Sequence, residues 1–118
     1  MEGNPGGRVD PVAGVDRMDG GVVVHLAGEL DLYNAHQVRE TLLACSAEKP
    51  GRLVVDLAAV DFVDSTALGV LVEARSRMAD RQAFLLAAPG SETRRALEVS
   101  GLDRHFTIRA SVEEALAS

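Results

Sequence analysis

Short apolar runs alternate with helical patterns from Val22 to the end of the chain. The runs at 22–27, 53–57 and 83–87 are dominated by Val, Leu and Ala and have the length of buried strands. Between them, apolar residues recur every three or four positions, as they do in helices that bury one side. A chain with this alternation is expected to form an α/β fold with right-handed crossovers.

Weaker strand patterns flank these runs. Residues 12–18 follow Pro11, which suits the edge of a sheet, and Asp19-Gly20-Gly21 has the composition of a hairpin turn. Another short strand is predicted at 105–109. The fold prediction is therefore an α/β domain with a mixed, mostly parallel sheet of four to five strands and about four helices.

The first predicted helix begins near Asn34, which has the side chain of a typical N-cap, and ends at the turn Lys49-Pro50-Gly51. One side of this helix carries an apolar stripe at helical spacing: Ala35, Val38, Leu42 and Cys45. Cys45 is the only cysteine, so the chain cannot form an internal disulfide. Its place on the stripe indicates a core residue.

The second predicted helix is reached from the strand at 53–57 through a short loop expected at 58–63. The residues Asp64-Ser65-Thr66 are expected to cap this helix, which runs to about Met78. Its apolar face is broad, so the helix should be largely buried.

Two more helices are predicted near the end of the chain. Ser91 is the expected cap of the third helix, and Gly101 fits the left-handed position just beyond its end. Ser111 and Glu114 have the spacing of a capping box that opens the last helix.

Size and charge limit what the chain can do. Its 118 residues fit one domain, predicted at 9–118 after a flexible, Gly-rich leader at 1–8. The core must be aliphatic, because 47% of the residues are hydrophobic but only 3% are aromatic. A formal net charge of −6 argues against nucleic acid as the main partner, since phosphate binding needs a basic patch.

The sequence resembles neither a secreted nor a membrane protein. The N-terminus lacks the apolar centre of a signal peptide. No apolar run approaches the ~20 residues that span a bilayer. A cytoplasmic protein with no membrane contact is therefore expected.

Two acidic loops follow predicted strands: Glu29-Leu30-Asp31 and the segment 61–66. Ligands and switches in open α/β sheets gather at the carboxyl ends of strands. If the two strands are neighbours, Asp31 and Ser65 face each other across one surface. Taken alone, the residues leave two interpretations of Ser65: a helix cap, or an exposed hydroxyl that accepts a phosphate at a helix N-terminus.

Patterns typical of enzymes are missing. The sequence has no G-x-S-x-G elbow, P-loop or G-x-G-x-x-G motif. The alternative of a small hydrolase that uses Ser65 therefore lacks a recognisable catalytic triad. The histidines, His25, His36 and His105, lack metal-ligand spacing. Asp56 resembles the phosphoacceptor of a response-regulator receiver, but the lysine that receivers need after their last strand is missing. We expect no catalytic residue, no cofactor and no metal.

Three motifs occur in an order that resembles one known family. The segment 54–57 is followed by 60–71, which reads VDFVDSTALGVL, while Gly28-Glu29-Leu30-Asp31 lies upstream and Ser100-Gly101-Leu102 lies downstream. Together they closely resemble the STAS-domain anti-sigma factor antagonists. The resemblance extends from about Val22 to Leu116 and implies the STAS fold.

The resemblance also implies a mechanism. In this family the unphosphorylated antagonist binds an anti-sigma factor that is also a serine kinase of the GHKL type, and a sigma factor is released. The kinase then phosphorylates the serine that corresponds to Ser65, which switches binding off, and a PP2C-type phosphatase reverses the modification. The implied alternative is a STAS adaptor in another signalling assembly, similar to a stressosome, without phosphorylation.

The family's motifs place a set of contact residues around Ser65. The resemblance implies that Asp31 helps to bind the kinase and that the partner also contacts Asp64, Thr66, Leu68 and Gly69. One position departs from the family pattern: Ala67 stands where glycine is usual. Because alanine is the better helix former, it is expected to stiffen the first turn and to crowd the approach to Ser65 slightly.

Overall fold

The computed structural model describes residues 10–118, so the leader predicted at 1–8 lies outside the described residues. The strands are β1 (Val12–Met18), β2 (Gly21–Leu30), β3 (Leu53–Val63), β4 (Phe84–Ala87) and β5 (Thr107–Arg109). The α-helices are α1 (Ala35–Ala47), α2 (Ser65–Ser76), α3 (Ser91–Val99) and α4 (Val112–Leu116). Two 3-10 turns, η2 (Arg81–Ala83) and η3 (Leu102–Arg104), precede β4 and β5.

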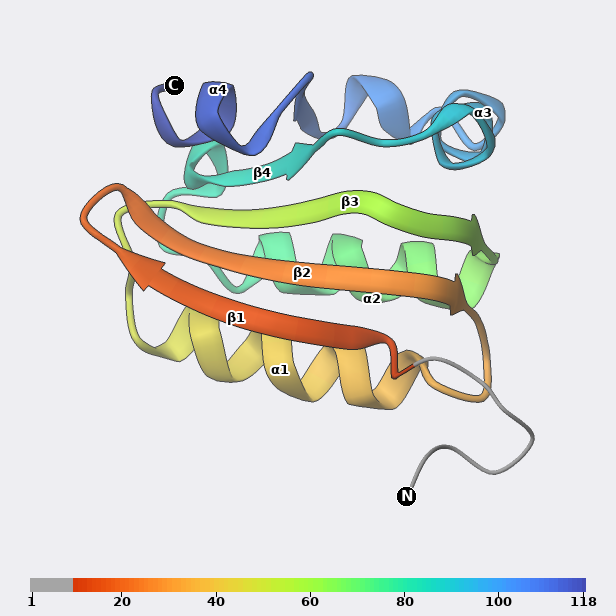
Figure 1. Ribbon diagram of the computed structural model, residues 1–118, viewed down its shortest axis with the longest axis horizontal. Helices are drawn as coiled ribbons and strands as arrows, with labels where there is room; N and C mark the ends of the chain where they lie inside the picture. Colours follow the sequence, from red (N-terminus) through yellow and green to blue (C-terminus); the bar gives the residue numbers. More distant parts are fainter. Residues whose placement is uncertain (1–9) are drawn as a thin grey trace.

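The strands form one sheet in the order β1-β2-β3-β4-β5 (Figure 1). β1 is antiparallel to β2 through the hairpin turn, and each later pair of neighbours is parallel. The prediction of a mixed, mostly parallel sheet with about four helices is confirmed.

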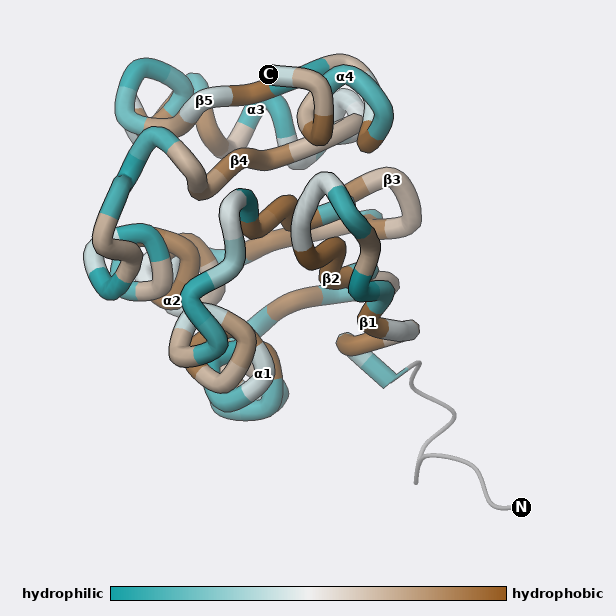
Figure 2. Tube along the Cα trace, turned by 90° about the vertical axis from the view of Figure 1, so that its left-hand side faces the viewer, coloured by the Kyte–Doolittle hydropathy of each residue, from teal (hydrophilic) through white to brown (hydrophobic). Residues whose placement is uncertain are grey.

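Helices cover the two faces of the sheet unequally. One face packs against α1, α2 and α3 in a core that includes Val24, Val55 and Leu71, all nearly inaccessible to solvent. The opposite face is covered by the short α4, where Ala115 packs against Val54. In Figure 2 the apolar strands are brown, with α1 and α2 on one side of them. This packing fixes α2, and with it Ser65, against the ends of β2 and β3.

The loop predicted at 58–63 is wrong, because β3 continues through these residues. Past its last pair with β4, at Asp56, β3 still pairs with β2 as far as Leu30↔Val63. The register shifts twice along this stretch, between His25 and Ala27 and between Gly28 and Glu29. These irregularities break the alternation of apolar residues, which is why the segment reads as a loop. The result is a two-stranded extension that ends at the Ser65 site.

The start of α4 and the end of α3 are as predicted, but the cap predicted at the start of α3 is not. Ser111 Oγ accepts a hydrogen bond from the Glu114 N–H (3.1 Å), and Gly101 is left-handed with φ of 78°. Ser91 is not a cap, because it is the first residue of α3, and Gly90 precedes it in extended conformation without a capping side chain.

A histidine joins three strands on the sheet face opposite α1 and α2. His25 Nδ1 lies 2.7 Å from Asp56 Oδ2, and its Nε2 lies 2.9 Å from Asp16 Oδ2. Because an ionised carboxylate only accepts hydrogen bonds, both ring nitrogens must donate, as they do in an imidazolium. The hydrogen bond to Asp56, helped by the one to Asp16, raises the pKa of His25 above its ordinary value.

This network predicts a pH-dependent contribution to stability. Because the pKa of His25 is higher in the folded than in the unfolded protein, its protonation adds to the free energy of unfolding. This addition is complete below the pKa of the unfolded state, about 6.5, and is lost as the pH rises through the pKa of the folded state. Urea unfolding of wild type and His25→Gln between pH 5.5 and 9 should show a difference of up to about 1 kcal/mol at the acid end that shrinks at higher pH. A difference that stays constant would contradict the assignment.

Candidate functional site

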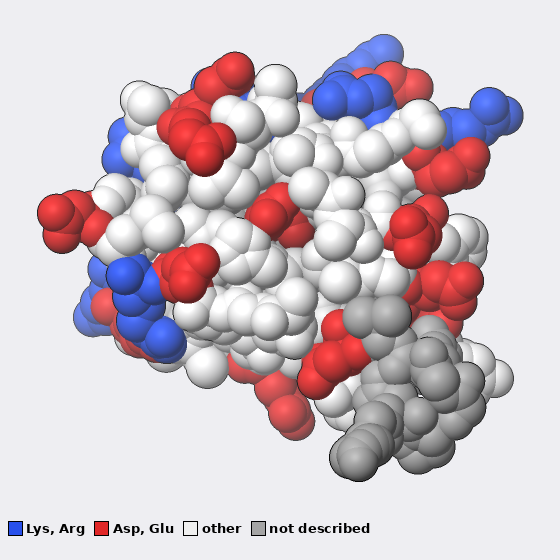
Figure 3. All heavy atoms as spheres, in the orientation of Figure 1, with Lys and Arg blue, Asp and Glu red and all other residues white. Residues whose placement is uncertain are grey.

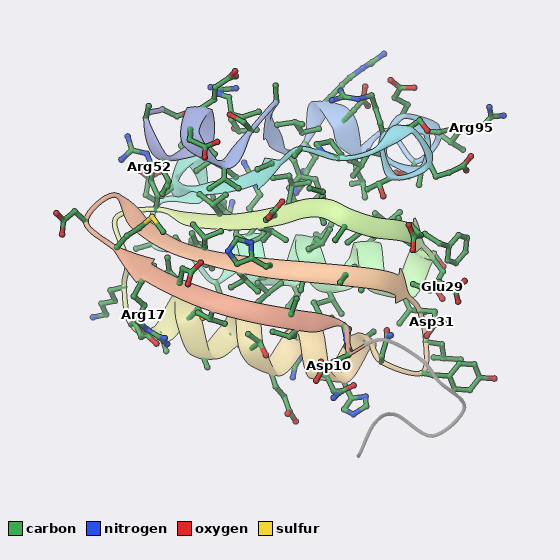
Figure 4. The ribbon with its side chains drawn as sticks, in the orientation of Figure 1. Asp10, Arg17, Glu29, Asp31, Arg52 and Arg95 are labelled. Atoms are coloured by element: carbon green, nitrogen blue, oxygen red, sulfur yellow. The ribbon has the colours of Figure 1, made fainter. Side chains whose placement is uncertain are left out.

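The site lies where β2 and β3 end side by side. Asp31 follows β2, and Ser65 begins α2 one residue after Asp64, which follows β3. The Asp64 N–H donates to the Leu30 carbonyl (3.0 Å), which continues the ladder between the two strands. The expectation that these strands are neighbours is confirmed. Figure 4 shows Glu29 and Asp31 together at this end of the sheet.

α2 is capped by Asp64 alone. Its backbone is extended, and its Oδ1 accepts a hydrogen bond from the Ala67 N–H (3.0 Å). Ser65 is already the first helical residue and is exposed. Its hydroxyl makes no hydrogen bond to any residue between 10 and 118. The prediction that Ser65 and Thr66 share the capping is wrong, and the Ser65 hydroxyl has no structural task within this part of the chain.

The other oxygen of Asp64 reaches the loop between β2 and α1. Asp64 Oδ2 accepts a hydrogen bond from the Leu32 N–H (3.0 Å). One carboxylate therefore holds the first turn of α2 and the neighbouring loop at the same time. The sequence indicates the cap but not the bond to Leu32, because the two residues are 32 positions apart.

Asn34 stabilises the same loop and does not cap α1. Its Oδ1 accepts from the Asp31 N–H (2.9 Å), and its Nδ2 donates to the Glu29 carbonyl (2.8 Å). Its φ of −123° and ψ of 1° are not the extended conformation that directs a side chain toward the first turn of a helix. The predicted cap is therefore corrected: this buried amide joins the loop to the end of β2.

The remaining predicted contact residues divide between surface and core. Thr66 and Gly69 are exposed on α2, and a Cβ at Gly69 would meet nothing within 4 Å. Leu68 is only 7% exposed and packs in the core. The methyl group of Ala67 also lies in the core, at 2% exposure, so it does not cover Ser65 as expected from the sequence.

Large apolar side chains are exposed at this end, and the sequence prediction missed them. Leu32, Tyr33 and Phe62 have exposures of 65%, 78% and 49%, and we call them the apolar rim. Carboxylates accompany them, since Glu29 pairs with Phe62 across the strands and Asp61 is exposed. Figure 3, in the same orientation as Figure 1, shows acidic side chains along the right-hand edge, where β2 and β3 end. Exposed apolar groups beside charged ones are typical of protein interaction surfaces. The sequence did contain one signal for these exposed side chains. Leu32 and Tyr33 are large residues placed just before the apolar stripe of α1 begins.

Catalysis at a serine commonly uses an available histidine or a metal ion. Within 10–118, no group of three or more His, Cys, Asp or Glu side chains is arranged to hold a metal ion. His25 uses both nitrogens on carboxylates, so neither is left to activate a serine. Hollows of about 520 and 440 Å³ are lined by other residues, among them Met78 and Asp56, and not by Ser65. In the same part of the chain, no helix has the length and apolar character to cross a bilayer.

The fold and site define a small α/β domain that presents a serine at a helix N-terminus beside an acidic, partly apolar surface. The chain belongs to the STAS domain family, whose model matches residues 13–115. Anti-sigma-F factor antagonist RsfB of Mycobacterium tuberculosis is 34% identical over 98 residues, covering 83% of this chain and 80% of that protein. The anti-sigma-B factor antagonist of Listeria monocytogenes is 36% identical over 87 residues, covering 73% and 76%.

A solved structure agrees with these relatives. The crystal structure of an anti-sigma factor antagonist from Mycobacterium paratuberculosis superposes with a TM-score of 0.81 at 33% identity, over 87% of this chain and 88% of that one. The resemblance to the STAS fold seen in the sequence is confirmed.

The role of Asn34 predicts a measurable loss of stability. Asn34→Ala would leave the Asp31 N–H and the Glu29 carbonyl without their partner, which should lower the free energy of unfolding by about 1–3 kcal/mol. Gln37→Ala, an exposed change on α1, should stay within about 0.5 kcal/mol of wild type. Urea unfolding measures both, and equal values for the two variants would rule out the structural role of Asn34.

Proposed function

We propose that this chain is an anti-sigma factor antagonist whose binding is switched by phosphorylation of Ser65. The observation that carries the proposal is the exposed Ser65 at the first position of α2, beside the loop that holds Asp31. The names of the relatives supply the class of partner. In the unphosphorylated state the chain binds an anti-sigma factor, and a sigma factor is released in the cytoplasm.

The proposed partner is also the kinase, of the GHKL type, and a PP2C-type phosphatase restores the unmodified serine. The N-terminus of α2 tolerates a phosphate on Ser65, because first-turn N–H groups and the helix dipole favour negative charge. The modification adds about −1.5 to −2 charges at pH 7. The free protein therefore has no need to refold when it is phosphorylated.

In a complex the same charge is costly. The carboxylates of Asp31, Asp61 and Asp64 belong to the ends of β2 and β3 that lead to Ser65, and a partner that covers them removes the water that screens their repulsion with a phosphate. A cost of ~3 kcal/mol would weaken binding about a hundredfold. The charge at the interface is sufficient to switch the partner off.

The proposed contact surface consists of two groups. Asp31, Thr66 and Gly69 lie with Ser65 on α2 and on the neighbouring loop, and the apolar rim supplies area that becomes buried on binding. Leu68 supports α2 from the core and is not part of this surface.

The first experiment measures the intact mass of the protein after incubation with ATP and a GHKL-type anti-sigma factor from the same genome. Wild type and Thr66→Ala should each gain one phosphate, and Ser65→Ala should gain none. Ser65→Asp should lose binding at least tenfold while its far-UV circular dichroism stays unchanged. A wild type that binds no such kinase and gains no phosphate would overturn the proposed function.

The apolar rim predicts a loss of affinity without a loss of stability. Phe62→Ala should weaken anti-sigma factor binding by about 2 kcal/mol, or roughly thirtyfold, as truncation of a central aromatic contact does. Met18→Ala is the matched control, because Met18 is 45% exposed against 49% for Phe62 and lies at the opposite end of the sheet. Calorimetric titration of each variant with the anti-sigma factor measures the two affinities. Equal affinities of Phe62→Ala and Met18→Ala would show that Phe62 is not part of the interface.

A further inference from the structure

We propose that Asp64 is a positioning residue, which holds the loop of Leu32 and Tyr33 in register with Ser65 so that a partner meets them as one surface. The inference rests on the proposed function for the identity of the partner. Its structural basis is independent: the two oxygens of Asp64 bind separate segments, Oδ1 the Ala67 N–H and Oδ2 the Leu32 N–H, each at 3.0 Å.

Capping alone does not require an aspartate. Serine, threonine and asparagine cap helices about as well, because each offers one oxygen to the first turn. Only a carboxylate brings two acceptor oxygens that point in different directions, whereas an asparagine replaces one of them with a donor. The bond to Leu32 is therefore the part of the Asp64 geometry that the cap leaves unexplained.

The backbone bond from the Asp64 N–H to the Leu30 carbonyl joins the loop and α2 at their roots, and the Asp64 carboxylate extends this connection to Leu32, farther out in the loop. Asn34 joins the loop to Asp31 and Glu29, which belong to the loop itself and to β2. The side chains of Leu32 and Tyr33 are mostly exposed, so packing adds little. Without the Asp64 bond, the exposed loop would sample more positions, and a partner would have to order it on binding. Preorganisation of this kind raises affinity without any new contact.

A direct contact between Asp64 and the partner is the alternative that the geometry disfavours. Both of its oxygens already accept backbone N–H groups, and the residue is only partly exposed. Asp61 offers a contrast three positions earlier, as an exposed carboxylate on the same strand end. If charge alone mattered, Asp61 and Asp64 would behave alike.

The test compares Asp64→Ser with Asp61→Ser. Serine at position 64 keeps a cap for the Ala67 N–H but is too short and has too few oxygens to hold Leu32. Hydrogen exchange of the Leu32 amide, followed by NMR in the free protein, should accelerate at least tenfold in Asp64→Ser and stay unchanged in Asp61→Ser. The dissociation constant for the anti-sigma factor should rise at least tenfold in Asp64→Ser, by the same factor at 50 and 300 mM salt.

Each outcome decides the proposal. Unchanged exchange at Leu32 in Asp64→Ser would overturn it, and so would a loss of affinity that disappears at high salt, because that is the behaviour of a direct ionic contact. A wild type that binds no anti-sigma factor would count against the proposed function, and the exchange measurement in the free chain would still decide whether Asp64 holds the loop.

Discussion

The parallel pairing of β2 with β3 is the constraint on which the site depends. The two strands stay paired well beyond the point where β4 turns away, so their carboxyl ends leave the sheet together. Because the pairing continues into the bond from the Asp64 N–H to the Leu30 carbonyl, the start of α2 and the loop after β2 cannot move independently at their roots. The core beneath, on α1 and α2, then fixes the direction in which Ser65 points.

Polar bonds at this end extend the order of the sheet into segments that have little core of their own. Asn34 fastens the loop to β2, and Asp64 fastens it to α2. The apolar rim can stay exposed because the backbone that carries it is held by hydrogen bonds. Asn34 and Asp64 thus contribute both to the stability of the domain and to the position of this loop, whereas the exposed side chains of the apolar rim contribute little to the core.

Much of this arrangement could be predicted from the sequence where one local pattern decides the structure. The Val-rich runs predict the strands, the stripe of α1 predicts its buried side, and Gly101 predicts a left-handed helix end. The predictions failed where distant residues decide. The continuation of β3 through 58–63 depends on pairing with β2, and the role of Asn34 depends on a backbone angle that its neighbours impose. The Leu32–Asp64 bond joins residues 32 positions apart, for which a single sequence holds no signal.

The division of labour between adjacent residues explains how a charge can be added here without damage to the fold. Had Ser65 been the cap of α2, phosphorylation would have changed the group that holds the first turn. Asp64 performs that task instead, and the Ser65 hydroxyl has no bond within residues 10–118 that modification would break. Ala67 fits the same scheme, since its methyl group is buried and leaves the outer side of the turn open. In the proposed switch, this separation lets the modified and unmodified forms share one fold and differ in the charge that they present to a partner.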